Sequence, residues 1–238
     1  RKLLDTYHQK YRFKHELKQE KDYILFPKDD GYRIVHLIFK YKNNSHRARQ
    51  YNGLLLEIQI RTKLQHIWAT AVETIGTLRN QAYKSKQGEK EWRNFFSATS
   101  SAFAHIEKLP LVPAHNKMSK EETFSIVKKM ESNLGVLNTV SGYSAALNLI
   151  DKQEKNWFYH LIVLNTQERK VSVSSYSRDN LKGATDGYAK AEARAAQGEK
   201  IESVLVSAGP LKSLRRAYPN YFLDISDFIA VVKNIIAF

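Results

Sequence analysis

The segment from Leu54 to Glu73, LLLEIQIRTKLQHIWATAVE, changes its hydrophobic period from two residues to between three and four. In its first part, Leu54, Leu56, Ile58 and Ile60 alternate with other residues, as in a strand with one face on a core. From Thr62 onward, apolar residues recur at helical spacing, which predicts a helix over residues 62–86. The segment therefore predicts a strand over residues 54–61 that runs directly into a core-facing helix.

The second face of this strand carries Glu57, Gln59 and Arg61. A carboxylate, an amide and a guanidinium in a row can bind a metal ion, ribose hydroxyls and phosphate. An ordinary solvent-exposed strand face carries the same residue types, and spacing alone favours that simpler interpretation.

A similar pattern precedes it. Residues 32–41 are rich in β-formers and predict another strand, on which Tyr32 and His36 share a face. The preceding loop supplies Lys21 and Lys28, so a base could stack on the tyrosine while the ammonium groups hold phosphates. The alternative is a turn at Pro27 and Gly31, with the Tyr32 ring packed at the sheet edge.

The rest of the chain predicts further helices and a second group of strands. Residues 3–20 predict a helix or a loop. The predicted elements beyond residue 86 are a helix over 88–107, a connection over 109–120, one or two helices over 123–153 with a break near Ser141 and Gly142, a hairpin of 157–164 and 170–175, a helix over 180–197, a strand over 201–207, and a last unit ending in a helix over 225–236. The composition changes near Asn156, which predicts domains at 1–155 and 156–238.

The composition narrows the class of protein. A hydrophobic content of 42% is enough for a packed core, and the formal net charge of +14 favours polyanionic partners. A basic surface that only aids solubility remains the alternative. The sequence has no cysteine, so it excludes disulfides and thiolate zinc sites. No apolar run approaches the roughly 20 residues of a membrane span, and the prediction is a cytoplasmic protein, although a secreted one would also suit the missing cysteine.

Several short motifs occur together in one order, which is harder to meet by chance than any single motif. They are Lys21-Asp22-Tyr23-Ile24, Pro27-Lys28, Gly31-Tyr32-Arg33 with His36, Glu57-Ile58-Gln59-Ile60-Arg61-Thr62, and the helix with His66, Trp68-Ala69 and Val72-Glu73. In this order they resemble the RelA/SpoT synthetase domain over about residues 1–107. The resemblance implies an α+β, nucleotidyltransferase-like fold with a mixed β-sheet flanked by helices.

The resemblance also implies a reaction and a role for each motif residue. The reaction is transfer of pyrophosphate from ATP to a ribose 3′-hydroxyl with Mg²⁺. Tyr32 would stack on the acceptor base, and Lys21, Lys28 and His36 would contact the acceptor, with Arg61 as a further substrate-binding residue. Glu57 would bind Mg²⁺ or activate the attacking hydroxyl, and Gln59 would support it.

Two departures from the family pattern affect these expectations. The family's ATP-binding basic residues and metal-binding Asp precede the segment that begins at Arg1, so we expect them upstream. Asp30 stands where alarmone synthetases commonly carry Asn, and a negative charge beside an anionic acceptor argues against GDP or GTP.

The region after residue 156 contains Tyr218-Pro219-Asn220-Tyr221 just before the last predicted helix. These tyrosines could simply anchor that helix. A Tyr-x-x-Tyr in a small α+β pseudo-zinc-finger domain behind a synthetase is, however, similar to the CapRel-type fused toxin–antitoxin proteins. That resemblance implies that Tyr218 and Tyr221 autoinhibit a toxic synthetase until a phage-encoded trigger protein relieves the block.

The sequence therefore leaves three candidate functions. The first is an autoinhibited pyrophosphokinase acting on the 3′-CCA end of tRNA in phage defence, the second a (p)ppGpp alarmone synthetase using GDP or GTP, and the third a catalytically inactive nucleotide- or protein-sensing module. A tRNA acceptor arm needs a basic surface, whereas a free nucleotide needs few cations. Candidates for such a surface, or for ordinary solvated faces, are Lys40, Lys42, Arg47, Arg49, Lys84, Lys86, Lys90 and Arg93.

Overall fold

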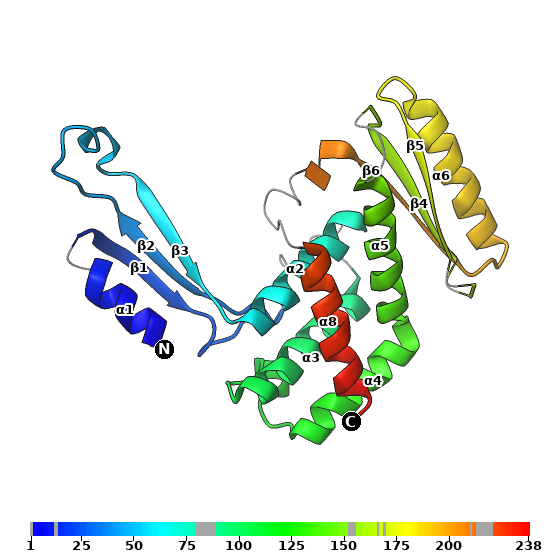
Figure 1. Ribbon diagram of the computed structural model, residues 1–238. Coiled ribbons are helices and arrows are strands. Elements are labelled where there is room, and N and C mark those ends of the chain that lie inside the picture. The colour runs from blue at the N-terminus through cyan, green and yellow to red at the C-terminus, as the bar shows by residue number, and fades with distance from the viewer. Residues whose placement is uncertain are drawn as a thin grey trace.

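Two three-stranded sheets lie on opposite sides of a layer of helices (Figure 1). The computed structural model describes residues 2–11, 14–79, 89–151, 156–165, 167–168, 170–209, 211–212 and 221–238. Its helices and strands are α1 (Lys2–Tyr11), β1 (Glu16–Asp22), β2 (Val35–Lys40), β3 (Leu55–Ile60), α2 (Lys63–Leu78), α3 (Lys90–Glu107), α4 (Lys120–Leu134), α5 (Val136–Asp151), β4 (Tyr159–Asn165), β5 (Lys170–Tyr176), α6 (Leu181–Ala196), β6 (Ile201–Ser207) and α8 (Tyr221–Ile236). Single turns of 3₁₀ helix occur at Arg49–Tyr51 and Pro113–His115. The predicted α+β class is confirmed.

The first sheet has the order β1-β2-β3 and is covered on one face by α1. Val35, Leu37 and Phe39 alternate along β2 and form a small core with Leu4 of α1. The strands predicted at 32–41 and 54–61 are confirmed as β2 and β3. Strand β1 was missed, because ELKQEKD is almost entirely polar. Its conformation comes from the hydrogen-bonded pairing with β2, a tertiary contact that overrides local propensity.

The resemblance implied a mixed sheet, and this expectation is wrong for the residues that the structure describes. Here each strand pair is antiparallel, namely β1 with β2, β2 with β3, β4 with β5, and β4 with β6. For β4 and β5 the connection from Asn165 to Lys170 is short, and a parallel neighbour would need a longer crossover connection.

The helical layer begins with α2, whose first turn is closed by a capping box between Thr62 and Gln65. The segment predicted as one or two helices over 123–153 forms two, α4 and α5, but the predicted break at Ser141 and Gly142 is wrong. The break lies at Gly135, which has a φ of 60° and ends α4. Gly142 lies inside α5, where an added Cβ would come within 2.8 Å of the Leu164 side chain. This glycine therefore allows close packing of α5 on β4.

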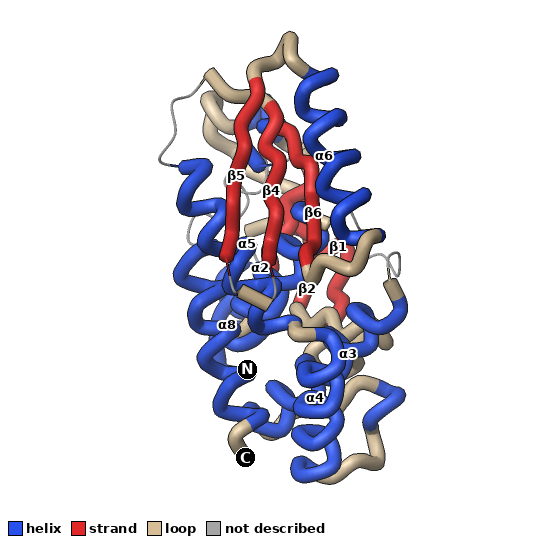
Figure 2. Tube along the Cα trace, turned by 90° about the vertical axis from the view of Figure 1, so that its right-hand side faces the viewer, coloured by secondary structure: helices blue, strands red, loops and turns tan. Residues whose placement is uncertain are grey.

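The second sheet has the order β5-β4-β6, seen with its strands side by side in Figure 2. The hairpin predicted at 157–164 and 170–175 is confirmed as β4 and β5, and the predicted helix and strand that follow are α6 and β6. Helices α5 and α6 both pack on this sheet. A zinc-finger-like domain is not evident in these elements.

One hydrophobic core joins the helices to the second sheet. It includes Ile67 of α2, Phe103 of α3, Ile162 of β4 and Phe228 of α8, and the rings of Phe103 and Phe228 lie 5.9 Å apart. Packing is thus continuous across the boundary predicted at residue 155, which stays a prediction about domain organisation. In the described ranges, we find no helix with both the length and the apolar character needed to cross a bilayer.

Candidate functional site

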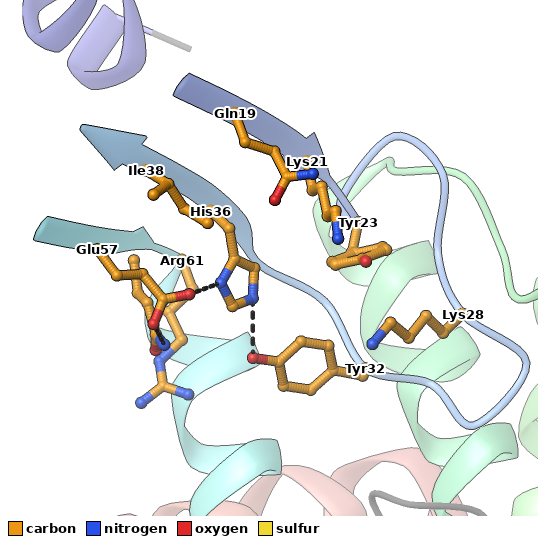
Figure 3. A pocket seen from close by; sticks show the side chains of 10 residues that line it. Gln19, Lys21, Tyr23, Lys28, Tyr32, His36, Ile38, Glu57 and Arg61 are labelled. Atoms are coloured by element: carbon orange, nitrogen blue, oxygen red, sulfur yellow. Dashed lines mark hydrogen bonds and ion pairs between the residues drawn. The ribbon is translucent and has the colours of Figure 1, made fainter. Parts of the chain in front are cut away.

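A pocket of about 470 Å³ opens on the face of the first sheet that α1 leaves uncovered (Figure 3). It is lined by residues of all three strands and of the loop between β1 and β2. These residues are Gln19, Lys21, Tyr23, Lys28, Tyr32, His36, Ile38, Glu57, Gln59 and Arg61. All seven residues predicted from the sequence as catalytic or substrate-binding are among them, although their roles remain predictions.

The sheet register explains why these residues meet. Lys21 pairs with His36, and His36 pairs with Gln59, so the three side chains stand in a row across the strands. Glu57 pairs with Ile38, one step further along the same face. Because side chains alternate between faces, the residues between them point to the α1 side, where Leu37 and Ile58 belong to the small core.

A hydrogen-bonded chain runs through the middle of the pocket (Figure 3). The Tyr32 hydroxyl lies 3.1 Å from Nε2 of His36, and Nδ1 of His36 is bonded to Oε1 of Glu57. The amide of Gln59 donates to the other carboxylate oxygen of Glu57 at 3.2 Å. An imidazole that donates a hydrogen bond from Nδ1 to Glu57 can accept one at Nε2 from the Tyr32 hydroxyl. The chain therefore orients the carboxylate and both rings together.

The His36 hydrogen bond has the largest effect and lowers the pKa of the Glu57 carboxyl. Burial opposes it, and the weaker effect of the Gln59 hydrogen bond lowers the pKa further. The Glu57 side chain is still 46% exposed. At neutral pH it is thus an ionised, accessible carboxylate. Such a group suits a metal ligand better than a general base, since an efficient base has a pKa near the working pH.

Three cations line the same pocket as this carboxylate. Lys21, Lys28 and Arg61 line the pocket, and within the described part of the chain neither Lys21 nor Arg61 forms an ion pair. The Lys28 ammonium lies 4.4 Å from the ring centre of Tyr23 and 4.9 Å from that of Tyr32. The two rings are 6.1 Å apart and tilted by 61°. The pocket thus combines aromatic faces for a base with positive charge for phosphates.

The loop that carries Lys28 and Tyr32 is held against the helices. Ser100 of α3 donates to the carbonyl of Gly31 at 2.7 Å, and Nε of Arg33 donates to the Ser100 hydroxyl at 2.9 Å. A second nitrogen of Arg33 donates to the Pro110 carbonyl at 2.7 Å. Burial lowers the pKa of the Arg33 guanidinium to about 10. Tyr32 is therefore placed by a buried contact between the loop and α3.

Asp30 has a different role from the one that the sequence suggested. Its carboxylate accepts a hydrogen bond from the backbone N–H of Tyr32 at 2.9 Å. It lines a neighbouring pocket with Asp29, Lys90 and Arg93, and it is not among the residues that line the pocket around Tyr32. The side chain shapes the loop, so the argument from Asp30 against a guanine nucleotide loses its support.

The pocket also contains residues that sequence reasoning did not assign. Gln19 and Ile38 lie one step further out on β1 and β2, and Tyr23 supplies the second ring. Gln19 could have been predicted only from the pairing of β1 with β2, because the polar segment 16–22 shows no hydrophobic alternation. Trp68, one of the motif residues on α2, is buried in the core, and its indole N–H donates to the Phe96 carbonyl at 2.9 Å. Of the pair assigned to autoinhibition, Tyr218 lies outside the described residues, as does the side chain of Tyr221.

The residues that line the pocket include one carboxylate that could bind a metal ion, that of Glu57. Among the described residues there is no group of three or more His, Cys, Asp and Glu side chains that could enclose a metal. Mg²⁺, however, is often bound by one or two carboxylates together with substrate phosphates and water. Glu57 fits such an open site, because its carboxylate is ionised at neutral pH and its side chain is exposed.

Comparison with known proteins gives two findings. Residues 2–88, less than half of the chain, match the family described as "Region found in RelA / SpoT proteins". This range contains every residue that lines the pocket. A GTP pyrophosphokinase family protein from Streptococcus pneumoniae is similar in structure over 45% of this chain and 48% of its own, with 24% sequence identity and a TM-score of 0.35. The match thus spans about half of that protein. No curated protein matches the chain.

Proposed function

We propose that this chain is a RelA/SpoT-type pyrophosphokinase that transfers pyrophosphate from ATP to a ribose 3′-hydroxyl. The observation that carries the proposal is the hydrogen-bonded series Tyr32–His36–Glu57. Lys21 and Arg61, which form no ion pair among the described residues, line the same pocket. The matched RelA/SpoT region covers the whole of this pocket. Pyrophosphate transfer requires positioning of two polyanionic substrates and charge neutralisation, and these are the properties of the site.

Each side chain has a defined task in this proposal. The ring of Tyr32 stacks on the acceptor base, and Lys28, held between two rings, binds an acceptor phosphate. Lys21 and Arg61 bind the remaining phosphate oxygens. Mg²⁺ held at Glu57 would supply positive charge to the transferred group. Gln59 and His36 keep the carboxylate in the orientation that this contact needs.

We further propose that the acceptor is the 3′-CCA end of tRNA and that the chain is the autoinhibited toxin of a fused toxin–antitoxin in phage defence. The position of α8 supports this regulation. The Lys63 ammonium is 2.7 Å from the Asp227 carboxylate, and Lys63 follows Arg61 of the pocket by two residues. Helix α8, which begins at Tyr221, packs against α2, the helix that follows the pocket strand β3 in the chain.

The test is transfer of label from ATP with a radioactive γ-phosphate by the full-length protein carrying Tyr218→Ala and Tyr221→Ala. Deacylated tRNA, GDP and GTP are offered separately, and Glu57→Gln in the same background is the control. We expect label on tRNA and none with Glu57→Gln. Label on GDP or GTP alone would make the protein a (p)ppGpp synthetase. No label on any acceptor would favour the inactive sensing module.

Toxicity gives an independent measure of regulation. Expression of the Tyr218→Ala, Tyr221→Ala protein should slow growth more than the unchanged protein does, because the block on the ATP site is removed. Equal growth of the two strains would refute autoinhibition by these tyrosines, whatever the acceptor is. Loss of the effect on adding Glu57→Gln would link toxicity to the pocket.

A further inference from the structure

The loop between β2 and β3 forms a basic projection at the end of the first sheet that lies far from the helices (Figure 1). We call residues 40–56 the hairpin tip. Its charged residues are Lys40, Lys42, Arg47 and Arg49, and the stretch contains no Asp or Glu. A local excess of positive charge attracts polyanions from solution.

The backbone of the hairpin tip is held by an ordered set of hydrogen bonds. The N–H of Tyr41 donates to the Leu54 carbonyl at 2.8 Å. Asn43 and Asn52 bond reciprocally, the first through its backbone N–H at 2.7 Å and the second through its side-chain amide at 3.0 Å. The ring of Tyr41 stacks on His15, with centroids 5.0 Å apart. The cations therefore stand on a defined scaffold, which lowers the entropy lost on binding.

These cations are available for a partner. Arg47 and Arg49 are exposed, and neither side chain forms an ion pair with any residue in the described ranges. Lys42 lies 3.5 Å from Glu16, but that carboxylate is also bonded to Lys18. Unpaired arginines on a surface are suited to phosphate groups, which they bind through two N–H groups at once.

The hairpin tip continues the face of the sheet that carries the pocket. His36, Ile38 and Lys40 alternate along β2 onto this face, and Ile38 already lines the pocket. Leu55 pairs with Lys40 and is 67% exposed. At about 3.3 Å per residue, Lys42 lies about 20 Å beyond His36. A mononucleotide held at Tyr32 would leave this stretch uncovered.

We propose that the hairpin tip binds the phosphodiester backbone of an RNA whose 3′ end occupies the pocket. This inference rests on the proposed function, because it takes the pocket as the acceptor site. Basic residues combined with exposed Leu54 and Leu55 would also suit an anionic membrane. An RNA fits better, since Lys40 lies on the sheet face that carries the pocket and the arginines follow it in the same hairpin tip. Lys84 and Lys86, the other basic candidates from the sequence, lie outside the described residues.

The experiment compares Arg47→Ala, Arg49→Ala with a matched control, Lys182→Ala, Lys190→Ala. The control removes the same charge from exposed positions on α6, at the opposite side of the molecule. Binding of fluorescently labelled deacylated tRNA is followed by anisotropy over a range of salt concentrations. The protein carries Tyr218→Ala and Tyr221→Ala, so that the pocket is open.

Loss of two phosphate contacts should reduce the slope of log K against log salt by about 1.4 to 1.8. At about 0.15 M salt, the same relation gives a rise in Kd of about 10- to 30-fold. The α6 control should change Kd less than twofold. Transfer to tRNA should show a raised KM in the hairpin-tip variant, whereas the α6 control should keep the KM of the starting protein.

Equal Kd values and salt slopes for the hairpin-tip and α6 variants would overturn the inference. It would also be overturned if the hairpin-tip variant lost binding to phosphatidylserine-containing vesicles but kept tRNA binding, since the surface would then be a membrane contact. Binding to tRNA requires no transfer. If the hairpin-tip arginines control tRNA binding but no acceptor is labelled, the proposed reaction fails and the RNA-binding surface stands.

Discussion

Replacing Gly31 by alanine should damage both the fold and the pocket, because this residue allows the loop to touch α3. The φ of Gly31 is 90°, where a side chain costs about 1–2 kcal/mol. An added Cβ would lie 2.7 Å from the Cβ of Ser100 and 3.0 Å from the Trp68 ring. Neither neighbour can move away easily, since Ser100 is buried in a helix and Trp68 is hydrogen-bonded to Phe96.

The two costs can be separated with a second glycine. Gly198 has a φ of 98°, and an added Cβ there would meet nothing within 4 Å. Gly198→Ala therefore reports the backbone cost alone, about 1–2 kcal/mol. Gly31→Ala adds an overpacking cost of about 1–3 kcal/mol. We expect the free energy of unfolding to fall by about 2–5 kcal/mol for Gly31→Ala.

Urea unfolding of the two variants and the starting protein measures these values. The acceptor KM should rise for Gly31→Ala, because the loop that carries Lys28 and Tyr32 must shift, and should not change for Gly198→Ala. Equal losses of stability in both variants would refute the steric reasoning. An unchanged acceptor KM for Gly31→Ala, in protein that remains folded, would show that the loop contact does not position the pocket.

Three further substitutions test the pocket and the core. In His36→Asn, the hydrogen bond that most lowers the pKa of Glu57 is lost, so that pKa rises toward its ordinary value. Because the ionised carboxylate is the active form and exists above its pKa, the acid limb of the transfer rate should move to higher pH; a limb that moves to lower pH would contradict the assignment. Tyr32→Ala should raise the acceptor KM about 5- to 150-fold, as expected for one stacked base, whereas Tyr32→Phe should change it far less; equal effects of the two would make the hydroxyl, and not the ring, the important group. Phe228→Ala, in the buried face of α8, should lower the free energy of unfolding in urea by about 3–5 kcal/mol. The control Phe26→Ala, at a position that is 76% exposed, should lower it by less than about 0.5 kcal/mol. Similar values for the two variants would mean that α8 is not part of the core.

Much of the secondary structure could be predicted, because several segments carry a strong hydrophobic period. Strand β3 and helix α2 were evident from the Leu54–Glu73 stretch, and the hairpin of β4 and β5 was also predicted. Strand β1 was not, since a polar sequence on an edge strand contains no periodic signal. The misplaced helix break has a similar cause: Gly135 and Gly142 look alike in the sequence, and only packing distinguishes a helix end from a close contact.

The candidate site, like the secondary structure, could be predicted only in part from the sequence. The alternation along the strand predicted at 54–61 was sufficient to place Glu57 and Gln59 on one face. Tyr32 lies in the loop before β2, so its contact with His36 depends on the loop and not on strand alternation. The sequence could not predict that Asp30 bonds back to its own loop, because the direction of a side chain in a turn depends on local backbone geometry.

The sequence by itself determined the strand and helix periods, the net positive charge and the order of the motif residues. These properties belong to near neighbours along the chain or to the composition as a whole. Only the tertiary structure decided that the two polar faces meet in one pocket, with His36 bonded to Glu57, since this depends on the cross-strand register. It also decided that α8 joins the core of α2 and that the loop at Gly31 is fixed by α3. Such contacts join residues far apart in the chain, and they form only when burial of the whole core outweighs the entropy of ordering it.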